Sequence, residues 1–167
     1  MWLIHQNAIL TKENLIKRKW QGDSRCLFCP EQETISHLFF ECPLAKFVWS
    51  IVAMVVGAPC RPCSFDQFWT WVQIYMSGGE LFHMVGLAAI CWSIWRSRNN
   101  VCFEKKKIRS PTEIICLASS FIVFWTELQK AENRNSLVAG AEALKNMALR
   151  LHPHGSVHRG AGGLLIQ

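Results

Sequence analysis

The chain has 167 residues, of which half are hydrophobic and 18% are charged, and its net charge is +6. This composition supplies a core and excludes a disordered polymer, while the length suits one domain or a small module joined to a larger one. The N-terminus has no signal-peptide pattern, so we expect an intracellular chain, with the nucleus as one possible location. Its eight cysteines are then expected to be reduced, which favours metal binding over disulfides.

The positive charge is concentrated in two segments. Residues 1–25 sum to +3 and residues 96–109 to +5, whereas residues 26–95 sum to −3. Basic segments on both sides of an acidic centre are compatible with a polyanionic partner. We expect the second segment, RSRNNVCFEKKKIR, to form a loop. It contacts nucleic acid, acts as a nuclear localisation signal, or serves only as a soluble linker.

Three apolar runs are candidates for membrane spans, at residues 47–56, 81–95 and 114–125. A span needs roughly 20 apolar residues, and each run is shorter than that. We therefore expect buried helices and no membrane partner.

Helix-start and helix-stop signals predict an all-α fold, in which no strand pattern and no internal repeat is visible. Capping threonine and serine residues and prolines at first helical positions mark the starts, and glycines or an Asn-Asn pair mark the ends. The expected helical segments are a short helix after Thr11, one or two turns around His37, and residues 43–56, 65–76, 80–98, 111–131 and 136–150.

The expected domain organisation has three parts. Residues 1–59 form a small zinc-binding module embedded in helices, residues 60–150 form a helical region, and residues 151–167 form a disordered tail. Large indole rings usually anchor packing between helices, so five tryptophans are expected in the core. They are Trp69, Trp71, Trp92, Trp95 and Trp125.

The stretch CLFCPEQETISHLFFEC carries the clearest chemical signal. Cys26 and Cys29 are spaced C-x2-C, His37 follows after seven residues, and Cys42 follows after four more. Three sulfur ligands and one nitrogen ligand complete a tetrahedral Zn²⁺ site with no open position for a catalytic water, so a structural site is expected. A redox role for the C-x2-C pair would need a βαβ context, and the alternative to a metal site is four unrelated buried residues.

A second C-x2-C pair, Cys60 and Cys63, permits a four-cysteine site together with Cys26 and Cys29. The 30 residues between the pairs exceed the usual gap of about 15–20, and His37 and Cys42 would then have no role. The first ligand set is therefore favoured. The remaining three thiols are expected to be small core residues: Cys91, Cys102 and Cys116.

The run AILTKENLIKRKWQGDSRCLFCPEQETISHLFFECPLAKFVW resembles the reverse-transcriptase zinc-binding domain. That domain follows the polymerase in LINE-type non-LTR retrotransposons, especially those of plant genomes. The shared elements are LT..NL.KR, the C-x2-C pair, ET..HLFF.C and the closing VW, and they cover roughly residues 1–50. The later CWSIWRSRNNVCFE resembles the tryptophan- and arginine-containing segment that trails the domain in such elements.

The resemblance implies that Cys26, Cys29, His37 and Cys42 are the zinc ligands, the same four that the spacing favours. It does not include Cys60 or Cys63. The chain carries neither a YxDD-type polymerase motif nor a carboxylate cluster suited to an endonuclease or RNase H. We therefore expect no enzyme, but a non-catalytic zinc-binding module from a polyprotein, clipped within the first helix of the domain.

Five basic residues adjoin the expected zinc module and are candidates for nucleic-acid contacts, because lysine and arginine neutralise phosphates. They are Lys12, Lys17, Arg18, Lys19 and Arg25. A solvated helix face is an equal alternative for them, and Trp20 is expected in the core rather than stacked on a base. The expected function is contact with RNA or DNA, or positioning of a reverse transcriptase on it. The alternative is a structural or protein-interaction module that packs against a polymerase domain.

Overall fold

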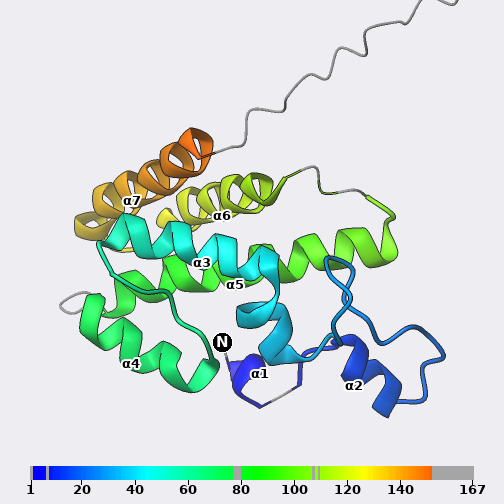
Figure 1. Cartoon of the computed structure of the whole chain (residues 1–167). Coiled ribbons are helices and arrows are strands. Elements are labelled where there is room, and N and C mark those ends of the chain that lie inside the picture. The colour runs from blue at the N-terminus through cyan, green and yellow to red at the C-terminus, as the bar shows by residue number, and fades with distance from the viewer. Residues whose placement is uncertain (1, 7, 77–79, 107, 109, 152–167) are drawn as a thin grey trace, which may run out of the picture.

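The fold consists of helices joined by loops, the longest of which, residues 18–36, carries Cys26 and Cys29. The computed structural model describes residues 2–6, 8–76, 80–106, 108 and 110–151 (Figure 1). In these ranges there is no β-strand, only one isolated antiparallel bridge between Arg25 and Gln32. The prediction of an all-α fold is confirmed. The elements are α1 (Trp2–His5), α2 (Lys12–Lys17), the π-helical turn η1 (His37–Glu41), α3 (Pro43–Val56), α4 (Phe65–Tyr75), α5 (Glu80–Phe103), α6 (Pro111–Thr126) and α7 (Ala131–Arg150).

Local sequence signals set most helix ends. The Thr11 hydroxyl accepts a hydrogen bond from the backbone N–H of Asn14, and Ser64 and Ser110 cap α4 and α6 in the same manner. Each cap satisfies a backbone donor that has no partner inside its helix. Gly57 ends α3 with a φ of 72°, a left-handed conformation that glycine adopts without steric cost.

The end of α5 differs from the prediction. The helix was expected to stop at Asn99-Asn100, but it continues to Phe103, so the first half of the basic run 96–109 is helical rather than a loop. The backbone N–H of Glu104 donates to the Asn100 carbonyl, which extends the hydrogen-bond ladder past the asparagine pair. Asparagine weakens a helix only modestly, and contacts with the rest of the fold override that preference here.

The connection between α6 and α7 also differs from the prediction. Helix α6 ends at Thr126 rather than near residue 131, and α7 begins at Ala131 rather than near residue 136. The guanidinium of Arg134 donates to the carbonyls of Glu127 and Gln129. These hydrogen bonds satisfy carbonyls left unpaired where α6 ends, and they stabilise a tight turn between two antiparallel helices.

The helices pack around one continuous hydrophobic core. Helix α3 packs against α6 and α7, while α5 packs against α6, α7 and η1. Buried residues on both sides of position 59 belong to the same core. The division into a module of residues 1–59 and a helical region of residues 60–150 stays a prediction. Residues 152–167, expected to be a disordered tail, lie outside the described residues.

An aromatic cluster joins the end of η1 to α3 and α4. The rings of Phe40 and Trp49 stack with centroids 5.9 Å apart, and the ring of Phe68 meets that of Trp49 edge to face at 5.6 Å. The indole N–H of Trp49 donates to the Phe39 carbonyl, so the buried indole has its hydrogen-bond partner. The cluster therefore fixes the direction in which the chain leaves η1.

The expectation of five core tryptophans is only partly correct. Trp71 is buried, and Trp95 and Trp125 are half-buried, whereas Trp69 and Trp92 are exposed. Trp69 is 38% exposed and Trp92 is 44% exposed, and Trp92 lines a pocket together with Leu3 and Ile4 of α1. Of the three cysteines expected in the core, Cys91 is buried and the other two are half-buried.

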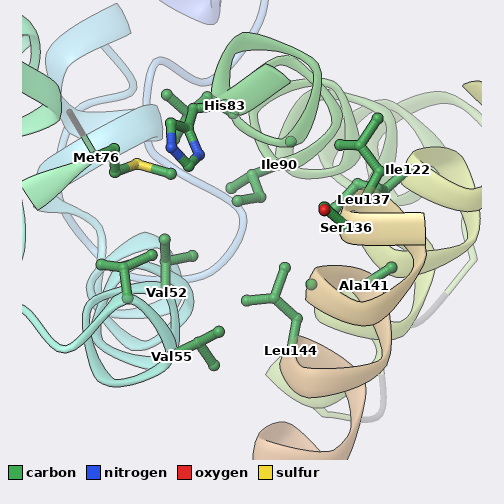
Figure 2. A pocket seen from close by; sticks show the side chains of 14 residues that line it. Val52, Val55, Met76, His83, Ile90, Ile122, Ser136, Leu137, Ala141 and Leu144 are labelled. Carbon is green, nitrogen blue, oxygen red and sulfur yellow. The ribbon is translucent and has the colours of Figure 1, made fainter. Parts of the chain in front are cut away.

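Helices α3, α5, α6 and α7 surround an apolar pocket of about 110 Å³ (Figure 2). Val52 and Val55 of α3 face Leu144 of α7 across it, and His83 lies at its edge. Burial lowers the pKa of His83, which favours the neutral imidazole in these surroundings. No helix within the described ranges combines the length and the apolar character that a membrane crossing requires.

Candidate metal centre

A tight turn places the first two candidate ligands. Arg25 and Gln32 form the antiparallel bridge, and the backbone N–H of Cys26 donates to the Glu31 carbonyl at 2.7 Å. The chain therefore reverses direction between Cys26 and Glu31. In addition, the Phe28 N–H points at Cys26 Sγ from 3.4 Å, as expected for a backbone donor that stabilises a thiolate.

The other two ligands are positioned by η1. His37 and Cys42 are five residues apart, and in an α-helix such residues would point about 140° away from each other. Here the Cys42 N–H donates to the His37 carbonyl at 2.7 Å, the hydrogen bond of a wider π-helical turn. This turn brings both side chains to one side of the chain. Pro43 then begins α3 directly after the last ligand.

The four ligand atoms form a compact group. They are provided by Cys26, Cys29, His37 and Cys42, and all lie within 4.8 Å of one another. Cys26 Sγ and Cys42 Sγ are 3.9 Å apart, close to the edge of about 3.8 Å expected for a tetrahedron with Zn–S bonds of about 2.3 Å. Cys29 Sγ and His37 Nε2 are 3.1 Å apart, so a bound ion would separate them by a few tenths of an ångström.

The chemistry and burial of these donors fit zinc. Three sulfurs and one imidazole nitrogen form a common structural Zn²⁺ set, and Cys26, His37 and Cys42 are buried while Cys29 is half-buried. The alternative set that used Cys60 and Cys63 is wrong, because both thiols are exposed and lie outside the group.

The thiols differ in their readiness to ionise. The Cys42 thiol donates towards Cys26 Sγ, which lowers the pKa of Cys26 to about 5 and raises the pKa of Cys42. Burial raises the pKa of Cys29. Cys26 therefore ionises most readily of the three thiols, and each thiol that still carries a proton must release it when a metal binds.

The five predicted nucleic-acid-binding residues do not share one environment. Lys12 is only 5% exposed, and its ammonium donates to the Arg25 carbonyl. A buried ammonium is unavailable to a phosphate, so we correct the prediction for Lys12 and assign it a structural role beside the metal centre. Its position reflects the contact with Arg25, which the charge pattern alone does not reveal.

The other four basic residues are exposed. Lys17 forms an ion pair with Glu13 in α2 at 2.7 Å, and Arg25 pairs with Asp23 at 2.9 Å. Hydrogen bonds from Arg25 lower the pKa of Asp23 to about 2. Arg18 and Lys19 follow α2 directly, and the backbone of Lys19 adopts a φ of 66°.

Trp20 is 37% exposed, so the expectation that it lies in the core is wrong. Its indole covers Gly22, where a Cβ would lie 1.9 Å from the ring. Only glycine fits beneath the indole in this arrangement. The contact holds Trp20 on the surface next to the basic residues that follow α2.

A buried ion pair that the sequence analysis did not predict lies beside the metal centre. Glu33, between Cys29 and His37, pairs with Arg98 of α5, and both side chains are fully buried. The backbone N–H of Lys12 also donates to the Glu33 carboxylate. The rings of Trp95 and Phe103 lie on the guanidinium of Arg98 at 5.3 and 5.6 Å from their centroids. The only sequence signal was the resemblance of CWSIWRSRNNVCFE to the segment that trails the zinc-binding domain.

Comparisons with known proteins agree with the geometry. No curated protein and no solved structure matches the chain. One family model does, and its description is zinc-binding in reverse transcriptase. The matched segment contains all four ligands of the candidate metal centre. Residues 1–49 thus match the family of reverse-transcriptase zinc-binding domains.

Proposed function

We propose that this zinc-binding module contacts single-stranded RNA or DNA and so helps to position a reverse transcriptase on its nucleic acid. The supporting observation is that four basic side chains at the end of α2 and next to the first zinc ligand in the sequence are exposed: Lys17, Arg18, Lys19 and Arg25. Such a group neutralises phosphates, while Trp20 offers an exposed aromatic face for a base.

Zinc has a structural role in this proposal. Bound to three thiolates and an imidazole, it has no open coordination position, so it holds the turn at residues 26–31 against η1 rather than activating water. Arg25 directly precedes this turn, and its carbonyl accepts a hydrogen bond from the Lys12 ammonium at the start of α2. The metal centre thereby fixes the position of α2 and of the basic residues that follow it.

The test is fluorescence anisotropy of the zinc-loaded chain with a labelled single-stranded RNA, repeated over a salt series. In the variant Lys17→Gln/Arg18→Gln/Lys19→Gln, removal of three phosphate contacts should weaken binding at least tenfold at low salt. It should also reduce the slope of log K against log salt by about 2, since each contact contributes about 0.7 on single strands.

The matched control is Lys130→Gln/Lys145→Gln/Arg150→Gln, which also removes three exposed charges, here from α7 and its N-cap at the opposite side of the molecule (Figure 1). It should change the affinity less than twofold. An equal loss of affinity in both variants would contradict a local binding surface and indicate non-specific attraction by the net charge. Absence of binding by a chain that holds one zinc would contradict the proposal outright.

A second candidate function is docking of a protein partner, such as a polymerase domain, on the exposed face of α6. Near the end of α6, Val123 is 43% exposed and Phe124 is 71% exposed, and Leu128 in the turn that follows is 77% exposed. A face with several exposed large apolar side chains is typical of an interaction surface. If it docks a partner, Phe124→Ser/Leu128→Ser should abolish that complex and leave RNA binding unchanged.

A further inference from the structure

Two thiols of the chain are exposed and have no role in the metal centre. Cys60 and Cys63 lie in the loop between α3 and α4, beyond the segment that matches the zinc-binding family. Within the described residues, no third histidine, cysteine or carboxylate joins them in a group that could hold a metal ion. Two ligands do not complete a tetrahedral site, so the described residues do not make this pair a metal site.

The loop holds both cysteines in place. The indole N–H of Trp71 donates to the Cys60 carbonyl at 2.7 Å, and Trp71 itself is buried. On the other side, Ser64 caps α4 immediately after Cys63. Pro62 lies between the two cysteines and fixes φ at its position. The loop is therefore already ordered while both cysteines are reduced. Closing the short Cys60–Cys63 disulfide ring then costs little further conformational entropy.

The surroundings of the sulfurs are polar and charged. Arg61 Nη1 lies 3.8 Å from Cys63 Sγ, and the thiol of Cys63 is directed at the Arg61 carbonyl at 3.6 Å. Cys60 Sγ lies 4.0 Å from the hydroxyl of Tyr75. A guanidinium beside an accessible sulfur is typical of reactive cysteines, whereas inert structural cysteines are buried in apolar surroundings.

We propose that Cys60 and Cys63 form a reversible dithiol–disulfide pair whose co-reactant is a low-molecular-weight disulfide such as oxidised glutathione. The Cys63 thiolate attacks one sulfur of glutathione disulfide, forms a mixed disulfide and releases one glutathione thiolate. The Cys60 thiolate then attacks Cys63 Sγ, closes the Cys60–Cys63 bond and releases the second glutathione. The chain loses two electrons and two protons, and glutathione disulfide becomes two molecules of glutathione.

The experiment incubates the zinc-loaded full chain with glutathione buffers of increasing disulfide content. Acid quenching and alkylation with N-ethylmaleimide then trap the remaining thiols for peptide mass spectrometry. A peptide that contains Cys60 and Cys63 should lose two hydrogens and both alkylation sites, while a chromophoric chelator detects no zinc release. In the Cys60→Ser variant, Cys63 should instead retain one glutathione, because its resolving thiol is gone.

Two further variants test the assigned roles. Arg61→Gln should slow the first exchange about fivefold, because it removes a positive charge near the attacking sulfur. Lys46→Gln, which removes an exposed cation from α3, should leave that rate unchanged. The proposal is overturned if each cysteine takes up its own glutathione without closing the internal bond. It is equally overturned if both stay reduced, or if the thiols lost are those of the metal centre and zinc is released with them.

Discussion

Arg98 donates hydrogen bonds from Nε and Nη2 to the carboxylate of Glu33, and neither side chain is exposed to solvent. The two residues are 65 positions apart. One belongs to the loop that carries the metal ligands and the other to α5. The pair therefore fastens the metal centre to the helical part of the chain, and Trp95 and Phe103 cover its cationic side.

Removing one partner of this buried ion pair should strongly destabilise the fold. In Arg98→Met the Glu33 carboxylate stays buried without its counter-charge, and the free energy of unfolding should fall by about 3–5 kcal/mol. Urea denaturation of the zinc-loaded chain measures the change. The double variant Arg98→Met/Glu33→Gln should recover part of the loss, because an uncharged amide still accepts from the Lys12 N–H.

The exposed ion pair of Lys17 with Glu13 supplies a matched control for that experiment. Lys17→Met should change stability by less than about 0.5 kcal/mol, as is usual for exposed pairs. A cost below about 1 kcal/mol for Arg98→Met would show that the carboxylate is not confined in the interior as described.

The Glu33–Arg98 pair also bears on whether residues 1–59 fold independently. A fragment of residues 1–59 lacks Arg98 and the α6 and α7 surfaces that cover α3. We expect it to bind zinc without reaching a cooperatively folded state, whereas residues 1–151 unfold cooperatively. Amide dispersion in NMR spectra with zinc present distinguishes the two. A well-dispersed spectrum for the short fragment would establish residues 1–59 as an independent domain.

Features that depend on neighbouring residues could be predicted from the sequence. Caps such as Thr11 and Ser64, and the end of α3 at Gly57, follow from hydrogen bonds and dihedral preferences within a few residues. The metal-centre spacing is equally local, because all four ligands lie within seventeen residues.

Features that depend on distant residues could not be predicted in this way. The continuation of α5 beyond its asparagine pair accompanies the pairing of Arg98 with a residue 65 positions earlier. Lys12 looked like a surface cation, but its ammonium is enclosed by a turn thirteen residues later. The exposure of Trp92 depends on which elements cover α5, and residue type does not reveal that.

Replacing Gly140 or Gly57 by alanine should change the stability of the fold in opposite directions. Gly140 lies inside α7, and a Cβ there would meet no atom within 4 Å. Gly140→Ala should therefore raise the free energy of unfolding by about 0.5–1 kcal/mol, since alanine loses less backbone entropy in a helix. Gly57→Ala should lower it by about 1 kcal/mol because of its left-handed φ. Thermal denaturation of both variants checks this, and a stabilised Gly57→Ala would contradict the assigned conformation.

Removal of zinc should act locally. Chelation leaves three thiols and an imidazole gathered without a common partner, so the turn at residues 26–31 and η1 should open. Hydrogen exchange should then accelerate at least tenfold at the Cys26 and Cys42 amides, whereas amides in α6 and α7 stay protected. His37→Ala should reproduce the effect with zinc present. Uniform acceleration over all helices would instead mean that the metal supports the whole fold.

X-ray absorption at the zinc edge of the reconstituted chain tests the central claim most directly. We predict one ion per chain with three sulfur neighbours at about 2.3 Å and one nitrogen neighbour at about 2.0–2.1 Å. The Cys60→Ser/Cys63→Ser variant should give the same spectrum. A shell of four sulfurs, or one dominated by oxygen, would contradict the assignment of Cys26, Cys29, His37 and Cys42 as the ligands.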